Sequence, residues 1–321
     1  MTQVIDDIFN IQIPMPRNPL KYLNSYFIKG KNYNLIIDTG LNHPEAEKIL
    51  FSAIDKLKFF PENTKLIITH MHSDHCGLGV KLNKKGFEVW VNPIDGKIIN
   101  NPTHWEKMIE FAKKLGMPLD RLDEAKMQHP GYRFRPMGKI EYNDIQDGDI
   151  FDLGNFRFRA IHTPGHTQGH MCLFEEQKKI FVSGDHILFN ITPNISQWEP
   201  NSSPLQDYLQ SLKKVRELEV ELVLPGHRRI FRDLKARVDE LFMHHKRRLK
   251  EVLEIVLDHP GLSAYDVASF MSWDMDYKSW DEFPMGQRWF ATGEAQAHLN
   301  YLCEQGKLRF EENQVIRYYP N

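Results

Sequence analysis

Histidine residues with metal-ligand spacing stand out in one short segment of this chain. Residues 69–75 read Thr-His-Met-His-Ser-Asp-His and directly follow the apolar run 65–69, whose composition predicts a β-strand. Side chains two residues apart on an extended chain point to the same side. His70 and His72 are therefore placed to hold one ion together.

The chain is expected to turn at Ser73, which directs Asp74 and His75 toward a second site a few Å away. Imidazole and carboxylate groups are the ligands that borderline divalent metals prefer. Four potential ligands within six residues predict a metal centre at the end of this strand.

Three further fragments of the same chemical character also follow predicted strands. Functional residues of α/β proteins gather at the carboxyl ends of strands, where loops converge while the sheet stays rigid. Each fragment contains glycine, which lets the backbone pass close to a crowded centre. The fragments are His162-Thr-Pro-Gly-His166-Thr-Gln-Gly-His170, Ser183-Gly-Asp185-His186 and Pro225-Gly-His227.

Strand-like and helix-like segments alternate over the first 230 residues, which predicts an α/β sandwich. Residues 22–29 and 33–37 are expected to form a hairpin, and residues 44–58 a helix opened by Pro44. Between about 97 and 140 the apolar residues have helical spacing, and we interpret this stretch as a helical insertion that could cover a site.

The C-terminal residues have a different pattern, with predicted helices followed by a β-ribbon. A long charged helix is predicted over 230–257, stopped by His259-Pro-Gly, and short helices over 263–271 and about 288–305 flank an acidic aromatic loop at 272–284. A β-ribbon is predicted over 307–319. Three helices closed by a two-stranded ribbon indicate a winged helix-turn-helix module.

Together the four ligand-rich fragments resemble the metallo-β-lactamase superfamily over residues 4 to 228, with glyoxalase II-like metal-dependent hydrolases among its members. The resemblance implies a four-layer αβ/βα sandwich over residues 1–229, followed by a winged-helix domain over 230–321. It implies a first metal bound by His70, His72 and His166, a second bound by Asp74, His75 and His227, Asp185 bridging the two, and Asp38 supporting the histidine loop.

A binuclear hydrolase is the function that this resemblance implies, with a metal-bridging hydroxide attacking an ester, thioester or lactone. Asp74 and Asp185 are the expected catalytic carboxylates. Zn²⁺ is the expected metal, with iron or manganese as alternatives. Two other activities stay open: a phosphodiesterase or endoribonuclease of the same fold, and a persulfide dioxygenase with a single iron on His70, His72 and Asp185.

Other residues near the fragments have less specific roles. His186 and Arg228 are candidates for substrate contact. Arg228 begins the basic run 228–250, which either attracts an anionic substrate or forms a solvated helix face. His162 and His170 are expected to have supporting roles within their loop, and Cys76 is expected to be a small core residue.

Composition indicates a soluble globular protein, and the small-molecule substrate that we expect follows from the resemblance. Lys and Arg number 41 against 43 Asp and Glu, so the net charge of −2 gives no overall attraction to nucleic acid or anionic membrane. Residues 228–321 carry 14 basic and 15 acidic residues, so nucleic acid is a possible but disfavoured partner. With three scattered cysteines, no apolar run of membrane length and no signal-peptide pattern, we expect a cytoplasmic protein, with self-association left open.

Overall fold

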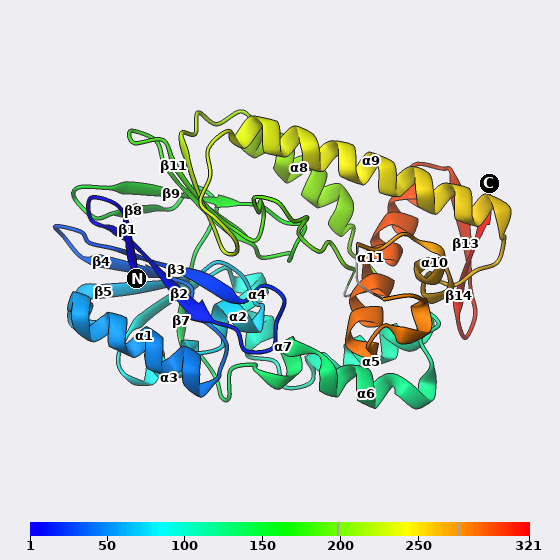
Figure 1. Ribbon diagram of the computed structural model, residues 1–321, viewed down its shortest axis with the longest axis horizontal. Helices are drawn as coiled ribbons and strands as arrows, with labels where there is room; N and C mark the ends of the chain where they lie inside the picture. The colour runs from blue at the N-terminus through cyan, green and yellow to red at the C-terminus, as the bar shows by residue number, and fades with distance from the viewer. Residues whose placement is uncertain (198, 275–276) are drawn as a thin grey trace. The chain divides into compact units, whose positions relative to one another are not determined.

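A computed structural model describes residues 1–197, 199–274 and 277–321 (Figure 1). Residues 275 and 276 of the predicted loop 272–284 lie outside the described residues. The chain divides into two compact units. The first consists of residues 1–101, 134–193 and 211–237, and the second of residues 102–133, 194–210 and 238–321.

A seven-stranded sheet forms half of the first unit, with its strands in sequence order. Strands β1 to β4 pair antiparallel, as the predicted hairpin requires, and β4 to β7 pair parallel. The strands are β1 (Thr2–Ile5), β2 (Ile8–Pro14), β3 (Tyr22–Ile28), β4 (Asn34–Ile37), β5 (Thr64–Ile68), β6 (Glu88–Val91) and β7 (Tyr142–Asp144).

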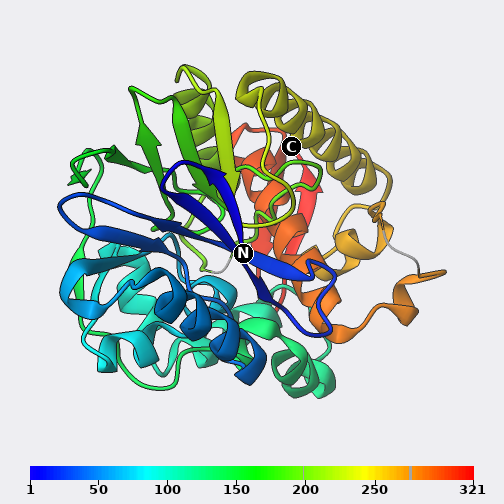
Figure 2. The same ribbon diagram turned by 60° about the vertical axis from the view of Figure 1, so that its left-hand side comes forward.

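A five-stranded sheet forms the other half, in the order β12-β11-β10-β9-β8, and the two sheets face each other in Figure 2. Only β11 and β12 pair parallel; the other neighbours are antiparallel. The strands are β8 (Ile150–Asp152), β9 (Arg157–His162), β10 (Met171–Glu175), β11 (Ile180–Gly184) and β12 (Leu222–Pro225).

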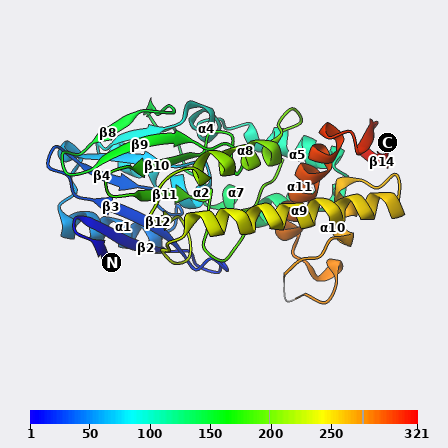
Figure 3. The same ribbon diagram turned by 90° about the horizontal axis from the view of Figure 1, so that it is seen from above.

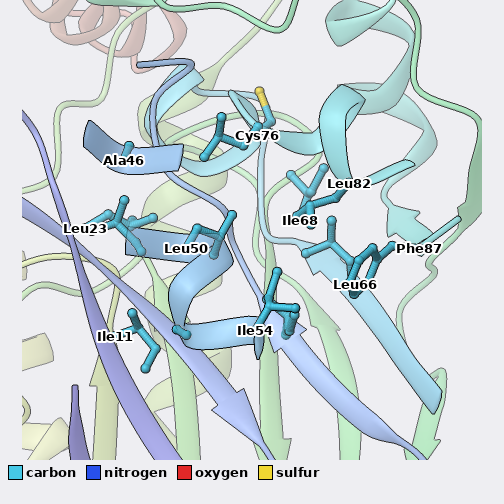
Figure 4. Close-up of a cluster of buried hydrophobic side chains, with 14 of the residues drawn as sticks. Ile11, Leu23, Ala46, Leu50, Ile54, Leu66, Ile68, Cys76, Leu82 and Phe87 are labelled. Carbon is cyan, nitrogen blue, oxygen red and sulfur yellow. The ribbon is translucent and has the colours of Figure 1, made fainter. Parts of the chain in front are cut away.

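The central strands of the first sheet are apolar on both faces because both faces are covered. Ile37 faces the core between the two sheets, whereas its neighbour Ile36 faces a second core beneath the helices. In that second core Leu50 of α1 and Leu82 of α3 pack near Leu66 (Figure 4). The helices along this part of the chain are α1 (Pro44–Leu57), α2 (Ser73–Cys76), α3 (Gly79–Lys84) and α4 (Pro93–Ile99).

Two apolar cores therefore hold the sheets and helices of the first unit together, which confirms the predicted α/β sandwich. Residues 211–216, the end of α8 (Pro204–Arg216), also belong to this unit, and Ser211 Oγ donates to the Pro164 carbonyl oxygen. Each ligand-rich fragment lies at the carboxyl end of a strand: β5, β9, β11 or β12.

The second unit is mainly helical. Its core joins Phe111 and Leu115 of the predicted insertion to residues of the C-terminal helices and hairpin, such as Val256, Leu299 and Tyr318. Its elements are α5 (His104–Lys114), α6 (Leu122–Gln128), α7 (Pro130–Arg133), most of α9 (Leu234–Asp258), α10 (Ala264–Phe270), α11 (Met285–Glu304), β13 (Leu308–Glu312) and β14 (Ile316–Pro320).

The long helix α9 appears uninterrupted in Figure 3, but it begins at Leu234 and not at residue 230 as predicted. Phe231 instead forms an isolated β-bridge with Val223, which holds this stretch in extended conformation. Asp233 Oδ1 then accepts from the Ala236 N–H and caps the helix. In the described part of the chain, none of the helices has the length and apolarity needed to cross a membrane.

Replacement of Leu50 by alanine tests the core beneath α1. Leu50 is fully buried, whereas its neighbour Ile49 on the same helix is 40% exposed. We expect Leu50→Ala to lower the free energy of unfolding by about 2–5 kcal/mol, because it leaves a cavity. Urea denaturation of Ile49→Ala provides the matched control, with an expected change below about 1 kcal/mol. Equal losses in the two variants would contradict this packing.

Candidate metal centre

The histidine loop leaves β5 in extended conformation and then turns. Helix α2 begins at Ser73, where the sequence predicts the turn, with His72 as the preceding extended residue. His70 Nε2 lies 3.1 Å from His72 Nδ1, so the two rings present nitrogen atoms to one another. The helical turn carries Asp74 and His75 away from this pair.

All seven predicted ligands come together from their four loops. They form three overlapping groups in which the potential ligand atoms lie within 4.8 Å of one another. The groups are His70 with His72 and His166, His70 with His75 and Asp185, and Asp74 with His75 and His227.

Asp185 lies between the two outer groups. Its Oδ1 is 3.5 Å from His75 Nε2, and its Oδ2 is 3.7 Å from His166 Nε2 and 3.5 Å from His227 Nε2. Gly226 permits this approach, because a Cβ atom there would lie 2.5 Å from Asp185 Oδ1. A carboxylate in this position can contact a cation in either group.

The polar atoms inside the cluster are arranged as ligands for a cation. His75 Nε2 and Asp185 Oδ1 are buried, and neither has a hydrogen-bond partner among the residues that the structure describes. Unpaired polar atoms of this kind are costly inside a protein unless a ligand or ion satisfies them. Neutral imidazoles and carboxylates are also the donor set that suits zinc and similar divalent ions.

Exposure differs across the cluster. His70, His75 and His227 are fully buried, whereas His72 and Asp74 are partly exposed. Burial, reinforced by the neighbouring histidines, holds the pKa of His70 well below its usual value and keeps that ring neutral. The same two causes lower the pKa of His72.

The carboxylates are ionised despite their burial. Burial alone would raise the pKa of Asp185, but the nearby His227 and His75 hold it well below its usual range. For His75, burial alone would lower the pKa, but Asp38, Asp185 and Asp74 together raise it. The centre therefore combines ionised carboxylates with imidazoles in a largely desolvated setting.

Asp38 lies beneath the histidine loop, directly after β4. Its Oδ1 accepts from the Thr69 N–H at 2.8 Å, and its Oδ2 accepts from Thr69 Oγ1 at 2.8 Å and lies 2.7 Å from His75 Nδ1. Thr69 Oγ1 in turn lies 3.0 Å from His70 Nδ1. Asp38 thus contacts His75 directly and His70 through Thr69.

Backbone and amide groups hold His227. Its Nδ1 lies 2.9 Å from the Tyr22 carbonyl oxygen, and its Nε2 lies 3.1 Å from Asp74 Oδ2. The Asn24 side chain donates to the carbonyl oxygens of Pro225 and Arg228, on either side of His227. The loop is therefore attached to β3.

Two residues with minor or no predicted roles also contact this loop system. His170 Nε2 accepts from the Asp185 N–H at 3.2 Å, which agrees with a supporting role for His170. Asp95 is a residue that we did not expect near the metal centre. It follows β6 at the same sheet edge as the ligand loops, and this position was the signal that the sequence offered. Its carboxylate is fully buried, which raises its pKa to about 6 against the opposing effect of its hydrogen bonds.

The two predicted substrate contacts lie outside the three ligand groups. His186 is fully buried, with its ring 6.0 Å from that of His170, and burial lowers its pKa to about 3. Arg228 is partly exposed and directly follows His227, with a left-handed backbone at φ 66°. Their contact with substrate stays a prediction. Cys76 is buried in the core, as predicted.

Comparison with known proteins identifies relatives of this chain. The model of the metallo-beta-lactamase superfamily matches residues 20–227, and that of the metallo-beta-lactamase-like C-terminal domain matches residues 249–321. The probable metallo-hydrolase YqjP of Bacillus subtilis is 26% identical, over 82% of this chain and 84% of its own. The human acyl-coenzyme A thioesterase MBLAC2 is 25% identical, over 64% of this chain and 72% of its own.

A solved structure extends the likeness to three dimensions. The beta-lactamase domain protein from Burkholderia ambifaria is 26% identical and covers 100% of this chain and 94% of its own, with a TM-score of 0.86. The matched family segment includes all seven clustered residues. The chain belongs to the metallo-beta-lactamase superfamily and is a metal-dependent hydrolase.

Proposed function

We propose that this protein is a binuclear metal-dependent hydrolase of acyl thioesters. The observation that carries the proposal is the pair of ligand groups on either side of Asp185: His70, His72 and His166 on one side, and Asp74, His75 and His227 on the other. Two divalent cations held there would act as Lewis acids and lower the pKa of bound water.

Asp38 sets the proton positions on two of these ligands. The Asp38 carboxylate already accepts from Thr69, and we propose that it also accepts from a protonated His75 Nδ1. The Thr69 hydroxyl donates to Asp38, which leaves its oxygen to accept from His70 Nδ1. In both rings Nε2 is therefore the nitrogen that faces the cluster, and a metal bound there would take the place of any proton on it.

His227 is prepared in the same way by the backbone. The Tyr22 carbonyl oxygen accepts from Nδ1, so Nε2, which lies 3.1 Å from Asp74 Oδ2, is the nitrogen that would bind a metal. His72 and Asp74 are the partly exposed members of the cluster. We propose that substrate approaches on their side, with Asp74 and Asp185 as the catalytic carboxylates.

The relative MBLAC2 supports a thioester substrate, since its name describes an acyl-coenzyme A thioesterase. Esters and lactones offer a similar carbonyl group and belong in the same test. We propose Zn²⁺ as the metal, with iron and manganese as alternatives that accept the same ligands. Arg228 and His186 are the proposed substrate contacts.

The alternative activities receive less support. A nucleic-acid-reading helix exposes one face to the groove, but α11, the corresponding helix, is buried along most of its length, including Trp289, Gln296 and His298. This burial argues against an endoribonuclease that reads its substrate through α11. A mononuclear iron centre on His70, His72 and Asp185 would leave the group around His227 without a role.

The remaining expectations about organisation stay proposals. We propose a catalytic domain over residues 1–229, with its insertion at about 97–140, and a winged-helix-like domain over 230–321. The latter is proposed as an interaction or self-association module, because it has the predicted order of three helices and a hairpin and a balanced charge. A cytoplasmic location is proposed from the sequence pattern.

Replacement of Asp185 by asparagine tests the hydrolase. We expect zinc-loaded wild-type protein to cleave acyl-coenzyme A thioesters, and Asp185→Asn to lower kcat/KM by at least about 100-fold, because it removes a ligand shared by both groups. Asp144→Asn, an exposed change at the end of β7, should leave the rate unchanged. Cleavage of single-stranded RNA or a simple phosphodiester in place of thioester, ester and lactone substrates would refute the proposal.

Replacement of Asp38 by asparagine tests the proton positions. Asp38 has a left-handed backbone at φ 61°, which asparagine tolerates, so the fold should persist. The amide can donate toward Thr69 or His75 and no longer enforces Nδ1 protonation. We expect zinc affinity to fall by about 10–100-fold in chelator competition. Unchanged affinity in folded Asp38→Asn would show that the carboxylate does not orient the ligands.

A further inference from the structure

Asp95 links two loops of the metal centre without belonging to either. It lies in α4, which follows the carboxyl end of β6, and its side chain is fully buried. Its Oδ2 accepts from the Met71 N–H at 2.8 Å and from Thr167 Oγ1 at 2.6 Å. Its Oδ1 accepts from the Gly169 N–H at 2.8 Å.

Two of these donors are directly adjacent to proposed metal ligands, and the third, Gly169, lies on the loop that carries His166. Met71 lies between His70 and His72, so anchoring its N–H fixes the extended stretch that places His70 Nε2 near His72 Nδ1. Thr167 directly follows His166 on a loop about 95 residues further along the chain. Asp95 therefore holds together the two segments that supply His70, His72 and His166.

The local packing is adapted to this carboxylate. A Cβ atom on Gly169 would lie 2.6 Å from Asp95 Oδ1, so only glycine allows its N–H to approach so closely. The carboxylate is not needed to cap its own helix, because the Asn92 side chain accepts from the Ile94 N–H at the start of α4. All three of these hydrogen bonds therefore serve the neighbouring loops.

We infer that Asp95 is a positioning residue for the first ligand group, His70, His72 and His166, which it orients through Met71 and Thr167. This inference rests on the proposed function, because it concerns the geometry of that same centre. The other group is held by different partners: Asp38 contacts His75, and the Tyr22 carbonyl contacts His227. Loss of Asp95 should therefore weaken one metal site and spare the other.

Asp95→Asn is the direct test, because it keeps the shape of the side chain. The amide has one oxygen for three donors and places an NH₂ group against at least one of them. We expect wild-type protein to bind two Zn²⁺ ions. In Asp95→Asn, we expect the affinity of one site to fall at least about 10-fold in chelator competition, with the other unchanged. The absorption spectrum of bound Co²⁺ should change for the weakened site alone.

Two further variants separate positioning from general destabilisation. Thr167→Val removes one of the three hydrogen bonds and should give a smaller loss at the same site, and it carries the test if Asp95→Asn does not fold. Glu175→Gln alters another buried carboxylate, which accepts from the N–H groups of Arg157 and Lys178 at the far end of β10. It should leave both zinc affinities unchanged.

Wild-type affinity at both sites in folded Asp95→Asn would overturn the inference, as would an equal loss of affinity in Glu175→Gln. Wild-type protein that binds no Zn²⁺ would instead contradict the proposed function. Loss at one site in Asp95→Asn and Thr167→Val, with no loss in Glu175→Gln, is the outcome that supports a positioning role.

Discussion

Desolvation of many ligand groups at one point is the constraint on which this structure depends. Five imidazoles and two carboxylates meet at one edge of the sandwich, and several of them are completely removed from water. Such groups are costly to bury unless their polar atoms are paired or bind a cation. The fold offsets this cost by pairing one ring nitrogen with a fixed partner and directing the other nitrogen into the cluster. In His227, for example, Nδ1 contacts the Tyr22 carbonyl oxygen.

The two sheets make this arrangement possible because their strand ends are rigid. Apolar residues on both faces of β4 and β5 pack into two cores, so the loops that follow these strands start from fixed positions. Polar contacts with neighbouring residues hold the loops in place beyond the strand ends. Asp38 anchors the histidine loop, Asn24 attaches the His227 loop to β3, and Asp95 joins the first two histidine-bearing loops. The chemistry thus depends on polar contacts between loops as much as on the apolar cores.

Much of the centre could be predicted from the sequence, because ligand-type residues at strand ends are a local signal. The turn at Ser73 and the strand-end position of the fragment around Asp185 followed from spacing and strand patterns, whereas the role of Asp185 as a shared ligand followed from the resemblance to the superfamily. Asp95 could not be recognised in the same way, because its role depends on Thr167 and Gly169, which only the fold brings near. Its place after β6 indicated that Asp95 lies at the ligand-bearing sheet edge, but it did not indicate which groups Asp95 contacts.

The division into units was also beyond local patterns. The predicted helical insertion at about 97–140 does contain helices. The packing of its residues 102–133 against the C-terminal helices arises from contacts distant in sequence, such as Phe111 with Val256. Similarly, the start of α9 is displaced by the pairing of Phe231 with Val223, which no helical periodicity reveals. Contacts between residues that are not adjacent in sequence therefore determine both the division into units and the start of α9.

A crystal structure of zinc-loaded protein, with anomalous scattering measured at the zinc edge, tests the central claim most directly. We expect two anomalous peaks, one among His70, His72 and His166 and the other among Asp74, His75 and His227, with the Asp185 carboxylate between them. A single peak, or a cluster of side chains that binds no zinc, would contradict it.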